Sequence, residues 1–189
     1  MKKIIFGCIT IVFMFFNNPL MAESYKLDPV HTQIMFTVSH MGFSNPTGSF
    51  VKFDGGFDFD ENNFENSSTN VTIHTAGIEM HDATWNEHLS GEQWFNVTKF
   101  PTMTFKSTKV VKTGDRTMDV IGDFTLLGVT KPVTLNVVFN KKGKMMQSDK
   151  AGFNATATID RTEFGMETYA PMIGTDIDIR INVEGELVK

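Results

Sequence analysis

The chain has 189 residues, of which 41% are hydrophobic and 21% are charged. These proportions are typical of one globular domain and exclude an intrinsically disordered chain, which combines low hydrophobicity with high net charge. The net charge of -5 argues against a nucleic-acid-binding protein, and a single cysteine excludes a disulfide scaffold and a four-cysteine zinc site. The chain has 18 phenylalanines but only two tryptophans and two tyrosines, so most of its aromatic surface carries no polar group.

The first 22 residues have the layout of a secretory signal peptide. Lys2 and Lys3 give a positive start, a mostly apolar run follows over residues 4–16, and Ala22 ends the segment. A helix of that run would span about 20 Å, short of the ~30 Å hydrocarbon core of a bilayer, so we prefer cleavage after Ala22 to a membrane anchor. We therefore predict a periplasmic or secreted protein with one domain over residues 23–189 and no stable membrane span.

From Tyr25 onward, apolar and polar residues alternate, which is typical of β-strands with one buried face and one face in water. This pattern favours antiparallel strands, because strands of parallel sheets are apolar on both faces. We predict about eight strands, whose alternating positions fall within residues 34–40, 51–59, 71–75, 103–105, 120–126, 133–139, 153–159 and 177–187. Turn residues separate them at 61–63, 113–115, 127–129 and 141–143.

One segment departs from this alternation. Thr84 and Glu87 fit a capping box, in which the first hydroxyl and a carboxylate three residues later each bond a backbone N–H group. Trp85 and Leu89 lie four residues apart and would share one helix face. We predict a short helix over about residues 84–93, before the next strand.

About eight strands, each with one apolar face, can close into a barrel or fold as a two-sheet sandwich. A long barrel lined by Phe, Ile and Val would have room for an elongated apolar ligand. A barrel of this size can also be filled by its own side chains. Composition and periodicity leave both alternatives open.

The sequence carries no recognisable catalytic motif such as G-x-S-x-G, a phosphate-binding loop or H-E-x-x-H. His74, His81 and His88 are spaced by seven residues, which is not a known metal-ligand pattern, so we predict no metal site. Asp160, Arg161 and neighbouring Glu163 offer a local ion pair, which we interpret as a surface salt bridge of small energetic value.

Several motifs, in order along the chain, together resemble the YceI-like family. Residues 25–32 (YKLDPVHT) resemble its opening, and residues 122–133 (GDFTLLGVTKPV) resemble its most specific motif. Residues 100–108, 159–161 and 164–166 add to the match. The chain also departs from the pattern: Trp85 and Asn86 stand where the family often has an Arg-Asp pair, and Trp94 stands where it commonly has Phe.

The resemblance implies an all-β, eight-stranded antiparallel, lipocalin-like barrel with one short helix near its mouth. It also implies a periplasmic or secreted protein that holds a long isoprenoid lipid, either a polyprenyl phosphate or an isoprenoid quinone, and requires no cofactor. The inward residues that we predict to contact this ligand are Phe36, Val38, Phe53, Phe57, Phe59, Val71, Ile73, Met103, Phe105, Val120, Phe124, Leu135, Val137 and Phe153. The residues that we predict at a polar mouth are His31, His40, His88 and Arg161.

Other functions stay open at this point. A fatty acid or fatty amide is an alternative ligand. A redox protein acting on a bound quinone is a weaker alternative to a binding protein without catalysis. A secreted interaction module with a filled barrel would show no cavity and no ligand. The sequence does not decide whether the chain forms a homodimer.

Overall fold

The structure is a computed structural model that describes residues 22–189. The predicted signal peptide lies outside these residues except for Ala22. The strands of the described chain are β1 (Glu23–Leu27), β2 (Gln33–His40), β3 (Thr47–Phe50), β4 (Phe53–Phe59), β5 (Ser68–His74), β6 (Ile78–Glu79), β7 (Thr102–Lys112), β8 (Thr117–Leu126), β9 (Val129–Met145), β10 (Ser148–Asp160) and β11 (Ile173–Leu187). The helices are α1 (Ala83–Ser90) and the short 3-10 helices η1 (Phe64–Asn66), η2 (Thr75–Gly77) and η3 (Arg161–Phe164).

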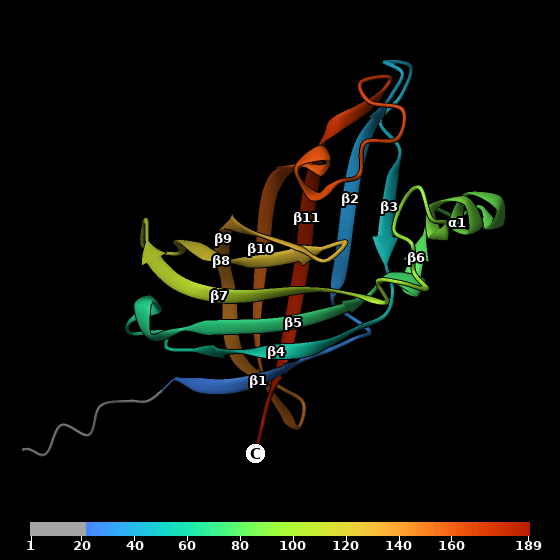
Figure 1. The fold of residues 1–189 in the computed structure, drawn as a ribbon. Helices are drawn as coiled ribbons and strands as arrows, with labels where there is room; N and C mark the ends of the chain where they lie inside the picture. The colour runs from blue at the N-terminus through green and yellow to red at the C-terminus, as the bar shows by residue number, and fades with distance from the viewer. Residues whose placement is uncertain (1–21) are drawn as a thin grey trace, which may run out of the picture.

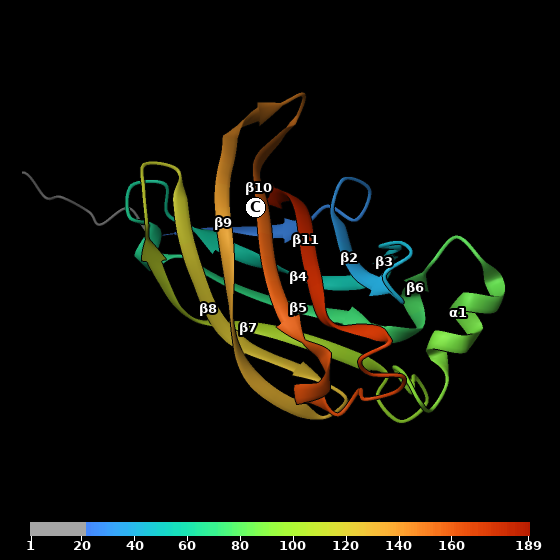
Figure 2. The ribbon, with the colours of Figure 1, turned by 90° about the horizontal axis from the view of Figure 1, so that it is seen from above.

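The strands close into an antiparallel barrel (Figures 1 and 2). The order β1-β4-β5-β7-β8-β9-β10-β11 returns to β1, because β11 pairs with both β10 and β1. The preceding part of β11 pairs with β2, so β1 and β2 act as two halves of one barrel strand. In the same way, β3 and β4 are two halves of one barrel strand, and β5 and β6 are two halves of the next, since β4 pairs with β5 while β3 pairs with β6. The predicted eight-stranded antiparallel barrel is confirmed.

The alternation of the sequence sets the register of the strands. Val71 on β5 lies opposite Phe105 on β7, which in turn lies opposite Phe124 on β8, so one row of apolar residues faces inward. The β8–β9 connection is a two-residue loop of Leu127 (φ 51°) and Gly128 (φ 77°). Positive φ at both positions is what a tight hairpin turn of this twist requires, and the predicted turn lies here.

The turn predicted at residues 141–143 is wrong. β9 continues to Met145 and pairs with β10 as far as Ser148, so the chain reverses at residues 146–147 instead. Phe139 pairs with Phe153 and Lys141 with Gly152, which leaves Asn140 as an extra residue in β9. This bulge lets the two strands bend with the barrel and stay paired beyond it.

Helix α1 begins and ends at residues other than those predicted. Its N-cap is Asp82, whose Oδ1 accepts a hydrogen bond from Trp85 N at 2.9 Å, so the predicted Thr84 cap is wrong. Asn86 links the helix to the end of β6, because its Oδ1 accepts a hydrogen bond from the backbone N–H of Met80, the residue after β6, at 2.7 Å. Within residues 22–189, no helix has the length and apolar character needed to cross a bilayer.

One end of the β4–β5 pair lies away from α1 (Figure 1). An aromatic cluster packs in the interior at that end. The ring centre of Phe59 lies 4.9 Å from those of Phe139 and Phe153 and 5.6 Å from that of Phe64 in η1. This cluster contains several of the many phenylalanines of the sequence, whose tilted and edge-to-face pairs pack without a polar partner.

Candidate functional site

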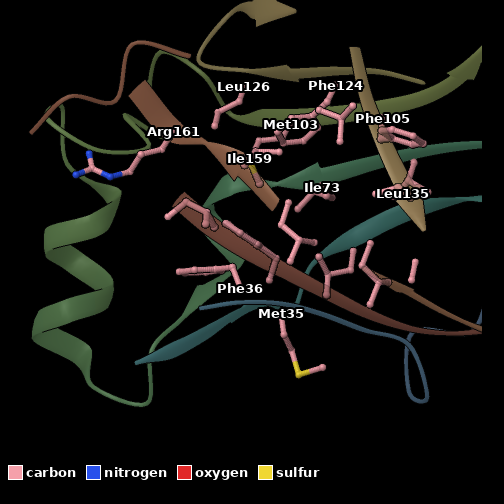
Figure 3. Close-up of a pocket in the computed structure, with 18 of the residues that line it drawn as sticks. Met35, Phe36, Ile73, Met103, Phe105, Phe124, Leu126, Leu135, Ile159 and Arg161 are labelled. Atoms are coloured by element: carbon pink, nitrogen blue, oxygen red, sulfur yellow. The ribbon is translucent and has the colours of Figure 1, made fainter. Parts of the chain in front are cut away.

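A cavity of about 400 Å³ occupies the barrel interior between this aromatic cluster and α1. Side chains from β1–β5 and β7–β11 line it, and most of them are apolar. Figure 3 shows Arg161 at the end of the cavity beside α1, and Phe105 and Leu135 toward the other end. A cavity of this size and character is typical of small-molecule sites, which pair a largely apolar wall with a few polar groups.

The structure brings most of the predicted ligand-contacting residues together. Those that line the cavity are Phe36, Val38, Phe57, Phe59, Val71, Ile73, Met103, Phe105, Val120, Phe124, Leu135, Val137 and Phe153. Phe53 does not line the cavity, so its predicted place in the cavity wall is wrong. It is the first residue of β4, directly after the break that separates β3 from β4, and its half-buried ring packs against the core from there.

Of the four residues predicted at the mouth, three line the cavity: His40, His88 and Arg161. His31 does not. It lies in the loop between β1 and β2, where its Nδ1 is 2.7 Å from Asp28 Oδ2 and 4.0 Å from Glu184 Oε2 near the end of β11. Arg161 instead contacts Gly174 near the start of β11, so the structure separates His31 from the other three residues.

Arg161 is buried, and its interpretation as a surface salt bridge is wrong. Its guanidinium group donates to four main-chain carbonyl oxygens: Nε to Gly174 at 2.9 Å, one terminal nitrogen to Thr168 at 3.0 Å and Ile173 at 2.8 Å, and the other to Met166. Burial lowers the pKa of Arg161 from its usual value, but a guanidinium group stays protonated in proteins.

The neighbouring acids pair elsewhere. Asp160 caps η3 by accepting from Thr162 N at 2.8 Å, and Glu163 Oε2 lies 3.3 Å from Lys131 Nζ. Arg161 is therefore a buried cation held by carbonyl dipoles rather than by a carboxylate. It ties η3 to the loop over residues 166–173, which carries part of the cavity wall.

Three further aromatic residues surround this end of the cavity, and sequence reasoning did not assign them to the site. Trp94 lies in the turn after α1, and its ring centre is 5.6 Å from the Arg161 guanidinium carbon and 6.4 Å from the Tyr169 ring. Trp85, on α1, has its ring 6.3 Å from His40. All three line the cavity. The available signal was the departure from the family pattern at Trp85 and Trp94.

A second polar cluster lies away from this end. Lys150 Nζ is 2.7 Å from Asp28 Oδ2 and 3.2 Å from Glu184 Oε2. The bond from Lys150, with help from His31 and Val30 N, holds the pKa of Asp28 well below its usual range, and the same bond raises the pKa of Lys150. Asp28, His31 and Glu184 are close enough to share a metal ion, but the Lys150 ammonium already forms ion pairs with both carboxylates.

Comparison with known proteins places this barrel in a family. A family model described as the YceI-like domain matches residues 25–185. The chain is 38% identical over 188 residues to Protein YceI of Shigella flexneri, with 98% of each chain covered. It is 39% identical over 168 residues to a UPF0312 protein of Pseudomonas putida, with 87% of each covered.

Solved structures have the same fold. BcnA of Burkholderia cenocepacia superposes with a TM-score of 0.78 at 22% identity, covering 84% of this chain and 98% of that one. The YceI protein of Campylobacter jejuni gives a TM-score of 0.74 at 28% identity, covering 80% and 90%. A polyisoprenoid binding domain from Saccharophagus degradans gives 0.66 at 15% identity, covering 88% and 99%.

Proposed function

The chain belongs to the YceI-like family, and we propose that it is a binding protein for a long-chain isoprenoid lipid, whose apolar tail occupies the barrel cavity. The observation that carries this proposal is the predominantly apolar wall of the cavity, which extends from the aromatic cluster to α1. The Saccharophagus degradans domain, which is named for polyisoprenoid binding, has the same fold and supports the choice of ligand.

The energetics of such a ligand are favourable without a charged clamp. A tail of about 40 carbons, at about 0.3 kcal/mol per heavy atom for a large ligand, gives about 12 kcal/mol of binding free energy. That corresponds to a dissociation constant in the nanomolar range. An apolar wall that covered the whole tail would therefore be sufficient without a charged clamp, and the cavity of about 400 Å³ covers part of such a tail.

We propose that the protein sequesters or carries this lipid in the periplasm or outside the cell and does not transform it. A lipid with a long apolar tail has negligible solubility in water, so movement through an aqueous compartment requires a protein that covers the tail. The proposed location rests on the layout of residues 1–22.

A binding series with lipids of increasing tail length tests this function. The protein is titrated with isoprenoid quinones that share one head group, and affinity is measured by quenching of intrinsic tryptophan fluorescence. We expect saturable one-to-one binding that strengthens as the tail lengthens. Affinity independent of tail length, or a preference for straight fatty acids or amides over isoprenoids, would contradict the proposal.

A pair of substitutions on β7 provides the matched control. Phe105 lines the cavity, whereas the adjacent Lys106 points to solvent on the other face of the strand. Phe105→Glu places a carboxylate against the tail and is expected to abolish binding. Lys106→Glu introduces the same acid outside the barrel and is expected to leave binding intact. Circular dichroism verifies that both variants are folded.

A further inference from the structure

Trp94 has a buried polar atom that the protein itself does not satisfy. Trp94 is 8% exposed, and its indole Nε1 has no hydrogen-bond partner. Among residues 22–189 it is the single buried side-chain nitrogen or oxygen atom in this state. Buried donors are nearly always paired, because an unpaired donor has lost its bonds to water without replacement.

The residue that carries this unpaired donor is part of the cavity wall. Trp94 lines the cavity, and so do its neighbours His88, Arg161 and Tyr169. The His88 ring lies 5.8 Å from the Trp94 ring. These four residues, which we call the head-group pocket, come from α1, the turn after it, η3 and the loop before β11. They bring polar groups together at one end of a cavity whose wall is otherwise mostly apolar.

We propose that Trp94 Nε1 donates a hydrogen bond to a carbonyl oxygen in an uncharged head group of the bound lipid, as in a quinone ring or an amide. This inference rests on the proposed function and deepens it, because it assigns the chemistry of the head group. Trp94 is then a specificity-determining residue: its N–H group favours ligands that carry an acceptor at the α1 end of the tail.

The hydrogen bonds that Arg161 already makes favour a carbonyl over a phosphate. Arg161, the one cation that lines the cavity in the described chain, already directs four N–H bonds to carbonyl oxygens of the protein. A phosphate brings a full charge and several acceptor oxygens, each of which needs a donor when it leaves water. The neutral N–H of Trp94 supplies one hydrogen bond, which one carbonyl oxygen of a quinone or an amide can accept without bringing a charge into the cavity.

An incoming head group can reach this donor because two neighbouring side chains, His88 and Tyr169, are exposed and free to change rotamer. His88 and Tyr169 are both exposed, and Tyr169 is 53% exposed. Exposed side chains change rotamer on the picosecond to nanosecond timescale, so they can turn aside as the ligand enters. Arg161 and the Trp94 ring are buried and stay in place.

Nuclear magnetic resonance of the indole N–H groups tests the bond in the unmodified protein. The chain has two tryptophans, so two indole signals are expected, and Trp94→Phe identifies the one that belongs to Trp94. Menaquinone-4, whose head group is a quinone, should move the Trp94 proton signal downfield. Phytane, an isoprenoid hydrocarbon without an acceptor, should not. A Trp94 signal that responds equally to both ligands would overturn the proposal.

Affinity of the Trp94→Phe variant provides the second measurement, with geranylgeranyl monophosphate as a third ligand. Loss of one neutral hydrogen bond should weaken menaquinone-4 binding about tenfold. Phytane binding should weaken clearly less than menaquinone-4 binding, because phytane loses only apolar contact with the larger ring. Equal weakening for all three ligands would mean that the ring only packs, and selective weakening of the phosphate would assign the site to an anion; either result overturns the carbonyl assignment. Failure of the wild-type protein to bind any of them would contradict the proposed function itself.

Discussion

Lys150 Nζ lies 2.7 Å from Asp28 Oδ2 and so joins β10 to the loop between β1 and β2. Both side chains are largely buried, at 15% and 9% exposed, and Glu184 on β11 contacts the same ammonium at 3.2 Å. The three segments meet where β1 gives way to β2 along β11, which is the place where the barrel closes. The ion pair therefore stabilises the closure of the barrel.

This arrangement predicts acid sensitivity. Because the pKa of Asp28 is lowered in the folded protein from the ordinary value of 3.8, its carboxylate stabilises the fold fully above that value, and the stabilisation is lost as the pH falls toward the folded-state pKa. Asp28→Asn should cost about 2 kcal/mol at neutral pH, in the range of charged hydrogen bonds. The difference between the two proteins should shrink below about pH 4.

Urea unfolding of both proteins between pH 3 and pH 7 measures this difference. Asp176→Asn, on the exposed face of β11, is the control and should change stability little at either end of the range. A difference between wild type and Asp28→Asn that stays constant with pH would show that the lost contact is not the ionised one.

Arg161 should be essential for stability. Arg161→Met removes the donors from four carbonyl oxygens, and the bond to Met166 is buried, so we expect a loss of about 3 kcal/mol or more. Arg180→Met removes an exposed guanidinium group from β11 and should cost less than about 0.5 kcal/mol. Equal effects in chemical denaturation would mean that the buried network is unimportant.

A cavity-filling substitution should separate binding from folding. Leu135 is half-buried and lines the cavity, so Leu135→Trp places a larger ring in the space that we assign to the tail. We expect lipid affinity to fall at least tenfold while the lipid-free protein keeps most of its stability. The exposed neighbour Asn136 gives the control Asn136→Ala, which should bind normally. Unchanged binding by Leu135→Trp would mean that the tail lies elsewhere.

The N-terminus of α1 distinguishes the two possible caps. Asp82→Ala should destabilise the helix by about 1 kcal/mol, whereas Thr84→Ala should have little effect. Because Trp85, His88 and Leu89 line the cavity, fraying of α1 in Asp82→Ala should also speed lipid release. Stopped-flow release rates and thermal unfolding measure both effects. A larger effect at Thr84 would support the capping box that the sequence predicts.

Alternation was sufficient to predict antiparallel strands and most of their inward residues, because period-two patterns report which face of a strand is buried. The choice of a barrel over a two-sheet sandwich came from the resemblance to the YceI-like family. It failed where a strand breaks. Val51 has the inward parity of Phe57 and Phe59 but is 60% exposed, since residues 51–52 form the break between β3 and β4. Phe53, next to that break, is misplaced for the same reason.

The polar part of the site could not be predicted because its contacts are not local. Arg161 has acids within two residues, which favoured a surface ion pair, yet two of its carbonyl partners lie 12 and 13 residues away along the chain. Residue type alone places His31 and His88 at one mouth. The fold sends His31 to the cluster with Asp28 and leaves His88 beside Trp94.

Native mass spectrometry of the protein, purified from its own cells without detergent, tests the central claim most directly. We expect one lipid of defined mass per chain, released on denaturation, with fragments of an isoprenoid tail attached to an uncharged carbonyl-bearing head. A protein without a bound mass that also fails to take up menaquinone-4 when the lipid is supplied would contradict the account.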